Sequence, residues 1–155
     1  MYSIPTLSLM WAPKGKQPRV QSRTKNRERT TLFGAVDEEG ARRYLMMAEK
    51  GNTANFLRFL GQLDEAIDQE LVVLMVLDKV SFHHARKVTA GFVAQHPRFH
   101  FLFLPPYSPA LNKQEDEWRA MRREVTHNTY YSEFQEQLSK VQAHFQSLGG
   151  VCFKH

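Results

Sequence analysis

Two acidic residues, Asp78 and Glu115, occupy positions suited to metal chemistry. Asp78 ends an uninterrupted apolar run over residues 71–77. Continuous apolarity predicts a strand buried on both faces of a parallel sheet, and such sheets place reactive groups at the carboxyl ends of their strands. Glu115 follows Asn112 by three residues, which predicts a helix start with a capping box. Magnesium prefers carboxylate oxygens, so this pair of residues predicts a divalent-metal site.

Each residue also has a purely structural interpretation. An aspartate at a strand end often only begins a loop or caps the next helix, and Glu115 could serve only as the partner of Asn112 in the capping box. Position alone leaves both interpretations of Asp78 and Glu115 open.

Two longer segments carry a family resemblance. LVVLMVLDKVSFHHARKV and LFLPPYSPALNKQEDEW resemble the DDE catalytic domain of mariner-superfamily transposases, in the branch used by bacterial insertion sequences. That family has Asp-Asn-x-x-x-His after a buried strand, and later Leu-Pro-Pro-Tyr-Ser-Pro-x-Leu-Asn-Pro-Ile-Glu-x-x-Trp. The matching positions here are Asp78 and His83, then Leu104 to Pro109, Leu111, Asn112, Glu115 and Trp118. The second motif is long and therefore specific, whereas the first alone would be weak.

The resemblance implies a ribonuclease-H-like α/β fold, a mixed sheet flanked by helices, over a single partial domain at 1–155. It also implies metal-dependent DNA cleavage and strand transfer, with Asp78 and Glu115 as catalytic metal ligands for Mg²⁺ or Mn²⁺, two ions when the site is complete. His83 is expected beside the site rather than in catalysis. The chain is expected to lack the first strand of the family and the catalytic aspartate at its end. It also departs from the family at Lys79 and at Lys113-Gln114.

A basic cluster lies between residues 14 and 29, where only Glu28 is acidic. Its members are Lys14, Lys16, Arg19, Arg23, Lys25, Arg27 and Arg29. Strands over 19–23 and 29–36 are predicted to form a hairpin that carries the cluster. Such a surface suits contact with DNA phosphates, although a solvated hairpin face is an equally good interpretation.

The remaining periodicity predicts further elements. A strand is expected over 42–48 and another over 99–104, and helices over 53–69, 81–95, 115–126 and 131–148. Strands followed by alternating helices and strands favour a mixed sheet covered by helices. Trp11 and Trp118 are expected in the core.

Composition favours an intracellular protein with a polyanionic partner. The 155 residues carry a net charge of +5, a sequence pI near 9.5 and a single cysteine, and no apolar run approaches the roughly 20 residues that span a bilayer. A cytoplasmic, nucleoid-associated protein is expected, with DNA (transposon ends and target) as its partner. An upstream transposase fragment and a second copy of the chain are further candidate partners. Three functions stay open: an active transposase domain, a catalytically dead DNA-binding remnant, and one half of a split enzyme.

Overall fold

The structure is a computed structural model that describes residues 1, 6–22, 28–105 and 111–154. The strands are β1 (Thr31–Val36), β2 (Arg43–Ala48), β3 (Val73–Leu77), β4 (Phe99–Phe103) and β5 (Val151–Phe153). The α-helices are α1 (Thr53–Ala66), α2 (Val93–Gln95), α3 (Lys113–Met121) and α4 (Phe134–Ser147), with π-helical segments at Lys87–Phe92 and Arg122–Thr126.

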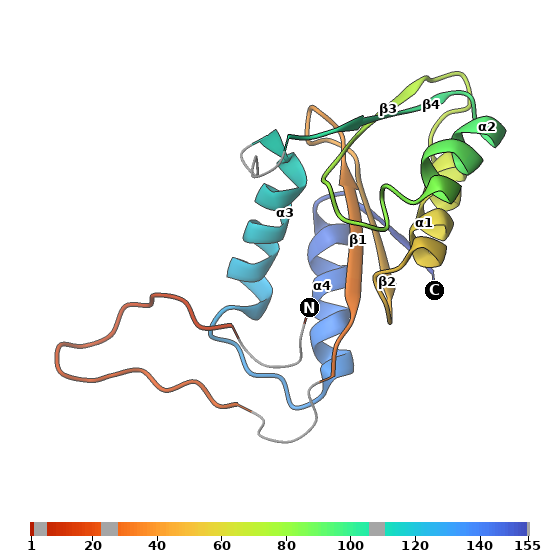
Figure 1. Cartoon of the computed structure of the whole chain (residues 1–155). Helices are drawn as coiled ribbons and strands as arrows, with labels where there is room; N and C mark the ends of the chain where they lie inside the picture. Colours follow the sequence, from red (N-terminus) through yellow and green to blue (C-terminus); the bar gives the residue numbers. More distant parts are fainter. Residues whose placement is uncertain (2–5, 23–27, 106–110, 155) are drawn as a thin grey trace.

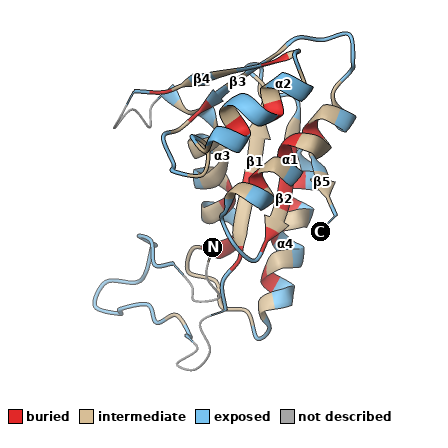
Figure 2. Cartoon of the chain, turned by 45° about the vertical axis from the view of Figure 1, so that its right-hand side comes forward, coloured by how far each residue is buried: buried red, intermediate tan, exposed pale blue. Residues whose placement is uncertain are grey.

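The described strands form two sheets. In the first, β2 pairs antiparallel with β1 and parallel with β5. In the second, β3 and β4 form a parallel pair. The β3–β4 ribbon crosses near the upper end of β1 at a steep angle in both views (Figures 1 and 2). Each of β1 and β3 therefore keeps one edge that no described strand covers.

Alternation along β2 divides the core between the two faces of the first sheet. Tyr44, Met46 and Ala48 pack with α1 and with buried residues of the second sheet, whereas Leu45 packs with α3 and α4. Because side chains of a strand alternate between faces, a single strand serves both clusters. Figure 2 shows the buried residues concentrated where these helices meet the strands.

The strand over 71–77 was predicted to be buried on both faces, and this is wrong. Leu74 and Val76 are 63% and 46% exposed, whereas Leu77 is buried. The physical reason is that β3 is paired only with β4 among the described strands and packs one face on the core. The uninterrupted apolar composition of residues 71–77 is nevertheless typical of a strand that is buried on both faces.

The predicted hairpin over 19–36 is also wrong. Residues 19–22 form no strand, residues 23–27 lie outside the described residues, and the antiparallel partner of β1 is β2. The strand predicted over 42–48 is confirmed as β2. The helix predicted over 81–95 begins later, because residues 81–84 form turns and the π-helical segment starts at Lys87.

The end of α4 leads into β5, a strand that periodicity does not predict. Gly149 ends the helix in the left-handed region, with φ of 75°, and its N–H bonds to the carbonyl of Gln146. A Cβ on Gly150 would lie 2.7 Å from the carbonyl oxygen of Phe145, so only glycine permits this return. Within the described residues, no helix is long and apolar enough to cross a membrane.

Candidate metal centre

Asp78 lies directly after β3, as the apolar run predicts. Its carboxylate oxygen Oδ1 is 2.7 Å from Nδ1 of His83 and accepts a long 3.4 Å bond from the N–H of Val80. The side chain remains 46% exposed, so the carboxylate is oriented by its neighbours and still open to a ligand.

His83 is held beside Asp78 by aromatic packing. Its ring lies 4.2 Å from the ring of Phe56 and 4.6 Å from that of Phe82. Burial lowers the pKa of His83, and the nearby Asp78 opposes that shift only in part. A neutral imidazole can donate from Nδ1 to the carboxylate, so His83 can hold the Asp78 side chain in place.

Glu115 lies in the first turn of α3, which Asn112 caps by accepting a bond from the N–H of Gln114 at 3.1 Å. The predicted reciprocal bond, in which the Asn112 N–H would donate to the Glu115 carboxylate, is not found among the described residues. Instead the carboxylate is 41% exposed and lies 3.9 Å from the guanidinium of Arg122. The Glu115 carboxylate is therefore accessible from solvent beside Arg122.

Two contacts fix α3 against the first sheet. A Cβ on Gly34 of β1 would lie 2.7 Å from the ring of Trp118, so α3 approaches β1 as closely as glycine allows. The guanidinium of Arg43, at the start of β2, donates hydrogen bonds to both carboxylate oxygens of Glu117, at 2.8 and 3.2 Å. Sequence reasoning assigned Glu117 only to the helix dipole and did not find Arg43, because their pairing spans 74 residues.

Asp78 and Glu115 line the same groove, between β1, β3 and the start of α3. Hard oxygen donors that are both half-exposed fit a divalent cation. Among the described residues, however, no group of three His, Cys, Asp or Glu side chains gathers for a metal. The residues present therefore fit part of a metal site, with Asp78 and Glu115 as the candidate donors and Asp37 and Glu38 elsewhere along the groove.

The structure describes only some residues of the basic cluster between residues 14 and 29. Residues 6–22 extend away from the body of the molecule (Figure 1), and this arm carries the exposed residues Lys14, Lys16 and Arg19. Arg29 is also exposed, whereas Arg23, Lys25 and Arg27 lie outside the described residues.

The arm leaves the body at a fixed point. The side chain of Asn128 exchanges two 3.0 Å bonds with the main chain of Ser8. Asn128 has a positive φ of 56°, which asparagine tolerates better than most residues. The core role expected for Trp11 is wrong, because Trp11 is 101% exposed on the arm. Trp118 is partly buried and packs against Phe145.

Comparison with known proteins assigns the family. The model of the DDE superfamily endonuclease family matches residues 3–139, and the chain belongs to this family. The insertion element IS630 uncharacterized 39 kDa protein of Shigella sonnei is 26% identical over 141 residues, which are 91% of this chain and 40% of that protein. The chain thus spans well under half of the length of this curated relative.

A solved structure shares the fold. The Mos1 transposase in its paired-end complex with the left transposon end matches with a TM-score of 0.72 and 17% identity, over 95% of this chain and 45% of that one. The predicted ribonuclease-H-like α/β fold is thereby confirmed.

Proposed function

We propose that this chain is the catalytic domain of an insertion-sequence transposase, which cleaves and transfers DNA strands with divalent metal ions. The observation that carries the proposal is that Asp78 and Glu115 line one groove in a chain of the DDE endonuclease family. Asp78 and Glu115 would hold Mg²⁺ or Mn²⁺, and His83 would orient Asp78. Bound ions of this kind activate the attacking oxygen and stabilise the leaving one.

DNA is the proposed partner of the basic arm. The Mos1 transposase structure holds a transposon end, and the arm of this chain carries exposed cations well away from the core. Cations on an extended segment reach a phosphate backbone without distorting the fold. Transposon ends and target DNA are the proposed ligands, and a second copy of the chain is a further proposed partner.

The first test is metal binding. Titration of Mn²⁺ into isotope-labelled protein is expected to broaden the amide signals near Asp78 and Glu115. Asp78→Asn or Glu115→Gln is expected to weaken binding by at least about tenfold, because loss of even an outer-shell group commonly costs that much.

Asp116→Asn is the matched control for Glu115→Gln, since Asp116 lies in the same helical turn and pairs instead with Arg119 at 3.0 Å. It should leave the Mn²⁺ titration unchanged. Equal weakening by all three variants would mean that the ion binds diffusely to surface charge, and the metal site would be rejected.

The second test is the salt dependence of binding to duplex DNA. Binding is expected to be largely independent of sequence, with each neutralised phosphate adding roughly −0.9 to the log–log salt slope. Replacing Arg23, Lys25 and Arg27 by Ala should make the slope shallower by up to about 2.7, the sum of three such contributions. A companion variant replaces Lys14, Lys16 and Arg19.

The control triple replaces Lys87, Lys140 and Lys154, which are exposed residues elsewhere. It lowers the net charge from +5 to +2 (5 − 3), as each arm triple does. If the control and arm variants share one slope, net charge alone governs binding and the arm is an ordinary solvated segment.

A catalytically dead DNA-binding remnant is the second candidate function. The observation that favours it is that, among the described residues, no group of three His, Cys, Asp or Glu side chains gathers for a metal, although Asp37 and Glu38 also line the groove. A remnant would retain the salt-dependent binding but show no Mn²⁺ broadening centred on Asp78.

A further inference from the structure

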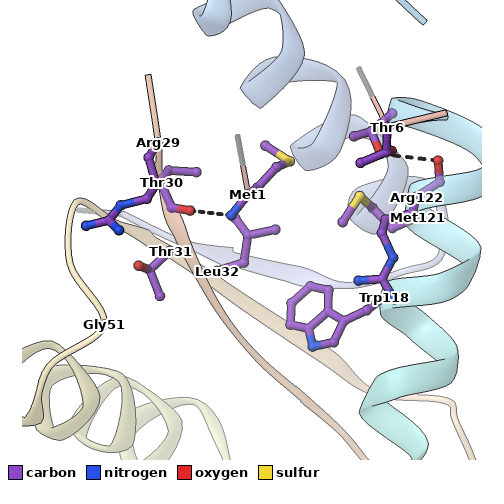
Figure 3. A pocket seen from close by; sticks show the side chains of 11 residues that line it. Met1, Thr6, Arg29, Thr30, Thr31, Leu32, Gly51, Trp118, Met121 and Arg122 are labelled. Carbon is purple, nitrogen blue, oxygen red and sulfur yellow. Dashed lines mark hydrogen bonds between the residues drawn. The ribbon is translucent and has the colours of Figure 1, made fainter. Parts of the chain in front are cut away.

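A second cavity lies between β1 and the end of α3, and its volume is about 500 Å³. Figure 3 shows Arg29 and Thr31 on one side of this β1–α3 cavity, and Trp118 and Arg122 on the other. Small-molecule pockets have volumes of about 300–1,000 Å³, so the cavity is large enough for a ligand of the size of a nucleotide.

The charge of the β1–α3 cavity favours an anion. Among the described residues, its lining includes the side chains of two arginines, Arg29 and Arg122, and no acidic side chain. Guanidinium groups are always charged in proteins, and their planar fork of N–H donors matches the oxygens of a phosphate group. A cavity with this lining is therefore suited to a phosphate.

The rest of the wall suits the nucleoside that carries such a phosphate. Leu32, Trp118 and Met121 give the cavity an apolar side. The Trp118 ring is partly buried and packs against Phe145 with 5.7 Å between ring centroids, which holds it in place. Nucleobases stack on aromatic side chains with little dependence on sequence. Trp118 and Arg122 therefore offer a base contact and a phosphate contact on the same side of the cavity (Figure 3).

Arg122 also contacts the candidate metal centre. It follows Glu115 by seven residues, which are almost two turns of helix, so the two side chains lie on the same face. Nη2 of Arg122 is 3.9 Å from Oε2 of Glu115, and each side chain is 41% exposed. This distance is too long for a hydrogen bond, and an exposed ion pair contributes little to stability. Arg122 can therefore leave Glu115 at low cost.

A phosphate group would be a stronger partner for Arg122 than Glu115 is. Arginine can donate two parallel, charge-assisted hydrogen bonds to one phosphate, whereas its pair with Glu115 is too long for either. While Arg122 lies beside Glu115, its positive charge competes with a metal ion for the same carboxylate. Transfer of Arg122 to a phosphate would remove this competition. Because coupling between two sites is reciprocal, a metal ion on Glu115 would strengthen phosphate binding to the same extent.

We propose that the β1–α3 cavity binds a nucleotide phosphate through Arg122, and that this contact withdraws Arg122 from Glu115 and so strengthens metal binding there. Arg29 contributes positive charge from the opposite side of the cavity. The effect on the metal ion rests on the proposed function, whereas binding of the phosphate does not. In a DNA-cleaving chain, this coupling would load the metal centre fully only after a DNA strand is in place.

The first measurement is the binding of thymidine 5′-phosphate to the 155-residue chain in chelator, without metal. The nucleotide is expected to shift the NMR signal of the Trp118 indole N–H. Thymidine, which lacks the phosphate, should bind at least about tenfold more weakly, and Arg122→Gln should weaken nucleotide binding by a similar factor, the loss expected for hydrogen bonds to a charged group. Arg119→Gln is the matched control, because Arg119 lies outside the lining and pairs with Asp116. Absence of nucleotide binding, or equal weakening by both variants, would overturn the proposal.

The second measurement is the affinity for Mn²⁺ with and without saturating nucleotide. In the unchanged chain the nucleotide is expected to raise this affinity about fivefold or more, which is the lower end of common coupling between sites. Arg122→Gln should bind Mn²⁺ more tightly than the unchanged chain when no nucleotide is present, because the competing charge is gone. A purely structural role of Arg122 predicts weaker Mn²⁺ binding in this variant, and that result would overturn the proposal. Arg122→Lys keeps the charge and should retain part of the coupling.

A short DNA duplex then replaces the nucleotide, to identify the source of the phosphate. Coupling by the duplex as well as by the nucleotide would identify the DNA backbone as the source, whereas coupling by the nucleotide alone would identify a free nucleotide. Both results support the phosphate contact of Arg122.

The remaining outcomes separate this proposal from the proposed function. Coupling that persists in Arg122→Gln with saturating nucleotide would mean that the nucleotide contacts the metal ion directly, and would overturn the role of Arg122. Mn²⁺ binding that the nucleotide does not change would overturn the same role and leave the proposed function standing. Nucleotide binding without Mn²⁺ binding would reject the proposed function and leave the phosphate cavity standing.

Discussion

The 155-residue chain is expected to leave transposon-end DNA uncut in Mg²⁺ or Mn²⁺. Two-metal cleavage needs a carboxylate between the ions. Asp37 and Glu38 line the groove together with Asp78 and Glu115, but no three such side chains gather for a metal among the described residues. Asp37 is a poor substitute, because it lies in the turn after β1, where its carboxylate accepts the N–H of Ala41 at 2.7 Å. The measurement is a cleavage assay on end-containing duplex with each metal ion in turn.

Two companion reactions make the outcome decisive. Asp78→Asn should be as inactive as the unchanged chain. Asp116→Asn should behave as the unchanged chain does. Robust cleavage by the chain, lost on Asp78→Asn, would show that the residues present already complete the site.

The site was more predictable from sequence than the sheet around it. Asp78 follows an apolar run and Glu115 follows an N-cap residue. Both patterns are local in the sequence, and the structure has a strand and a helix start at these positions. Whether their carboxylates share a cation stays a prediction. Arg43, by contrast, forms an ion pair with Glu117, which is 74 residues away in the sequence. No local sequence pattern indicates a pair of this kind.

The errors in the sheet have a common physical origin. Residues 71–77 have the composition of a strand buried on both faces, but burial depends on neighbours that a sequence window does not contain. Leu74 and Val76 are exposed because β3, among the described strands, pairs only with β4 and packs one face on the core. The hairpin error arose because residues 19–23 resemble a strand in composition, whereas β2 offers β1 a partner with six residues in register.

Arg98 carries the second large prediction, which concerns stability. Its guanidinium lies just before β4 and reaches the end of α1, where helix carbonyls lack partners in their own helix. It donates to the carbonyls of Asp64 at 2.6 Å and Ile67 at 3.2 Å. It also bonds to the carbonyls of Asp68 and Leu71 and forms a 2.7 Å ion pair with the carboxylate of Asp64.

Arg98→Ala is expected to lower the free energy of unfolding by about 3 kcal/mol, since it leaves a mostly buried carboxylate and several carbonyls short of donors. For a domain of this size that loss corresponds to a fall in Tm of roughly 6–12 °C. Urea unfolding and calorimetry measure the two quantities. Arg98→Lys is the informative comparison, because it keeps the charge and loses the planar fork that serves several acceptors at once.

Lysine at this position should therefore recover less than half of the lost stability. Arg86→Ala is the matched control, since Arg86 is exposed and precedes the π-helical segment at Lys87, and such surface changes usually alter stability by no more than about 0.5 kcal/mol. If Arg98→Lys were as stable as the unchanged chain, the ion pair with Asp64 alone would anchor α1 to β4. If Arg98→Ala were no worse than Arg86→Ala, water would satisfy the end of α1 and the guanidinium would have no structural role.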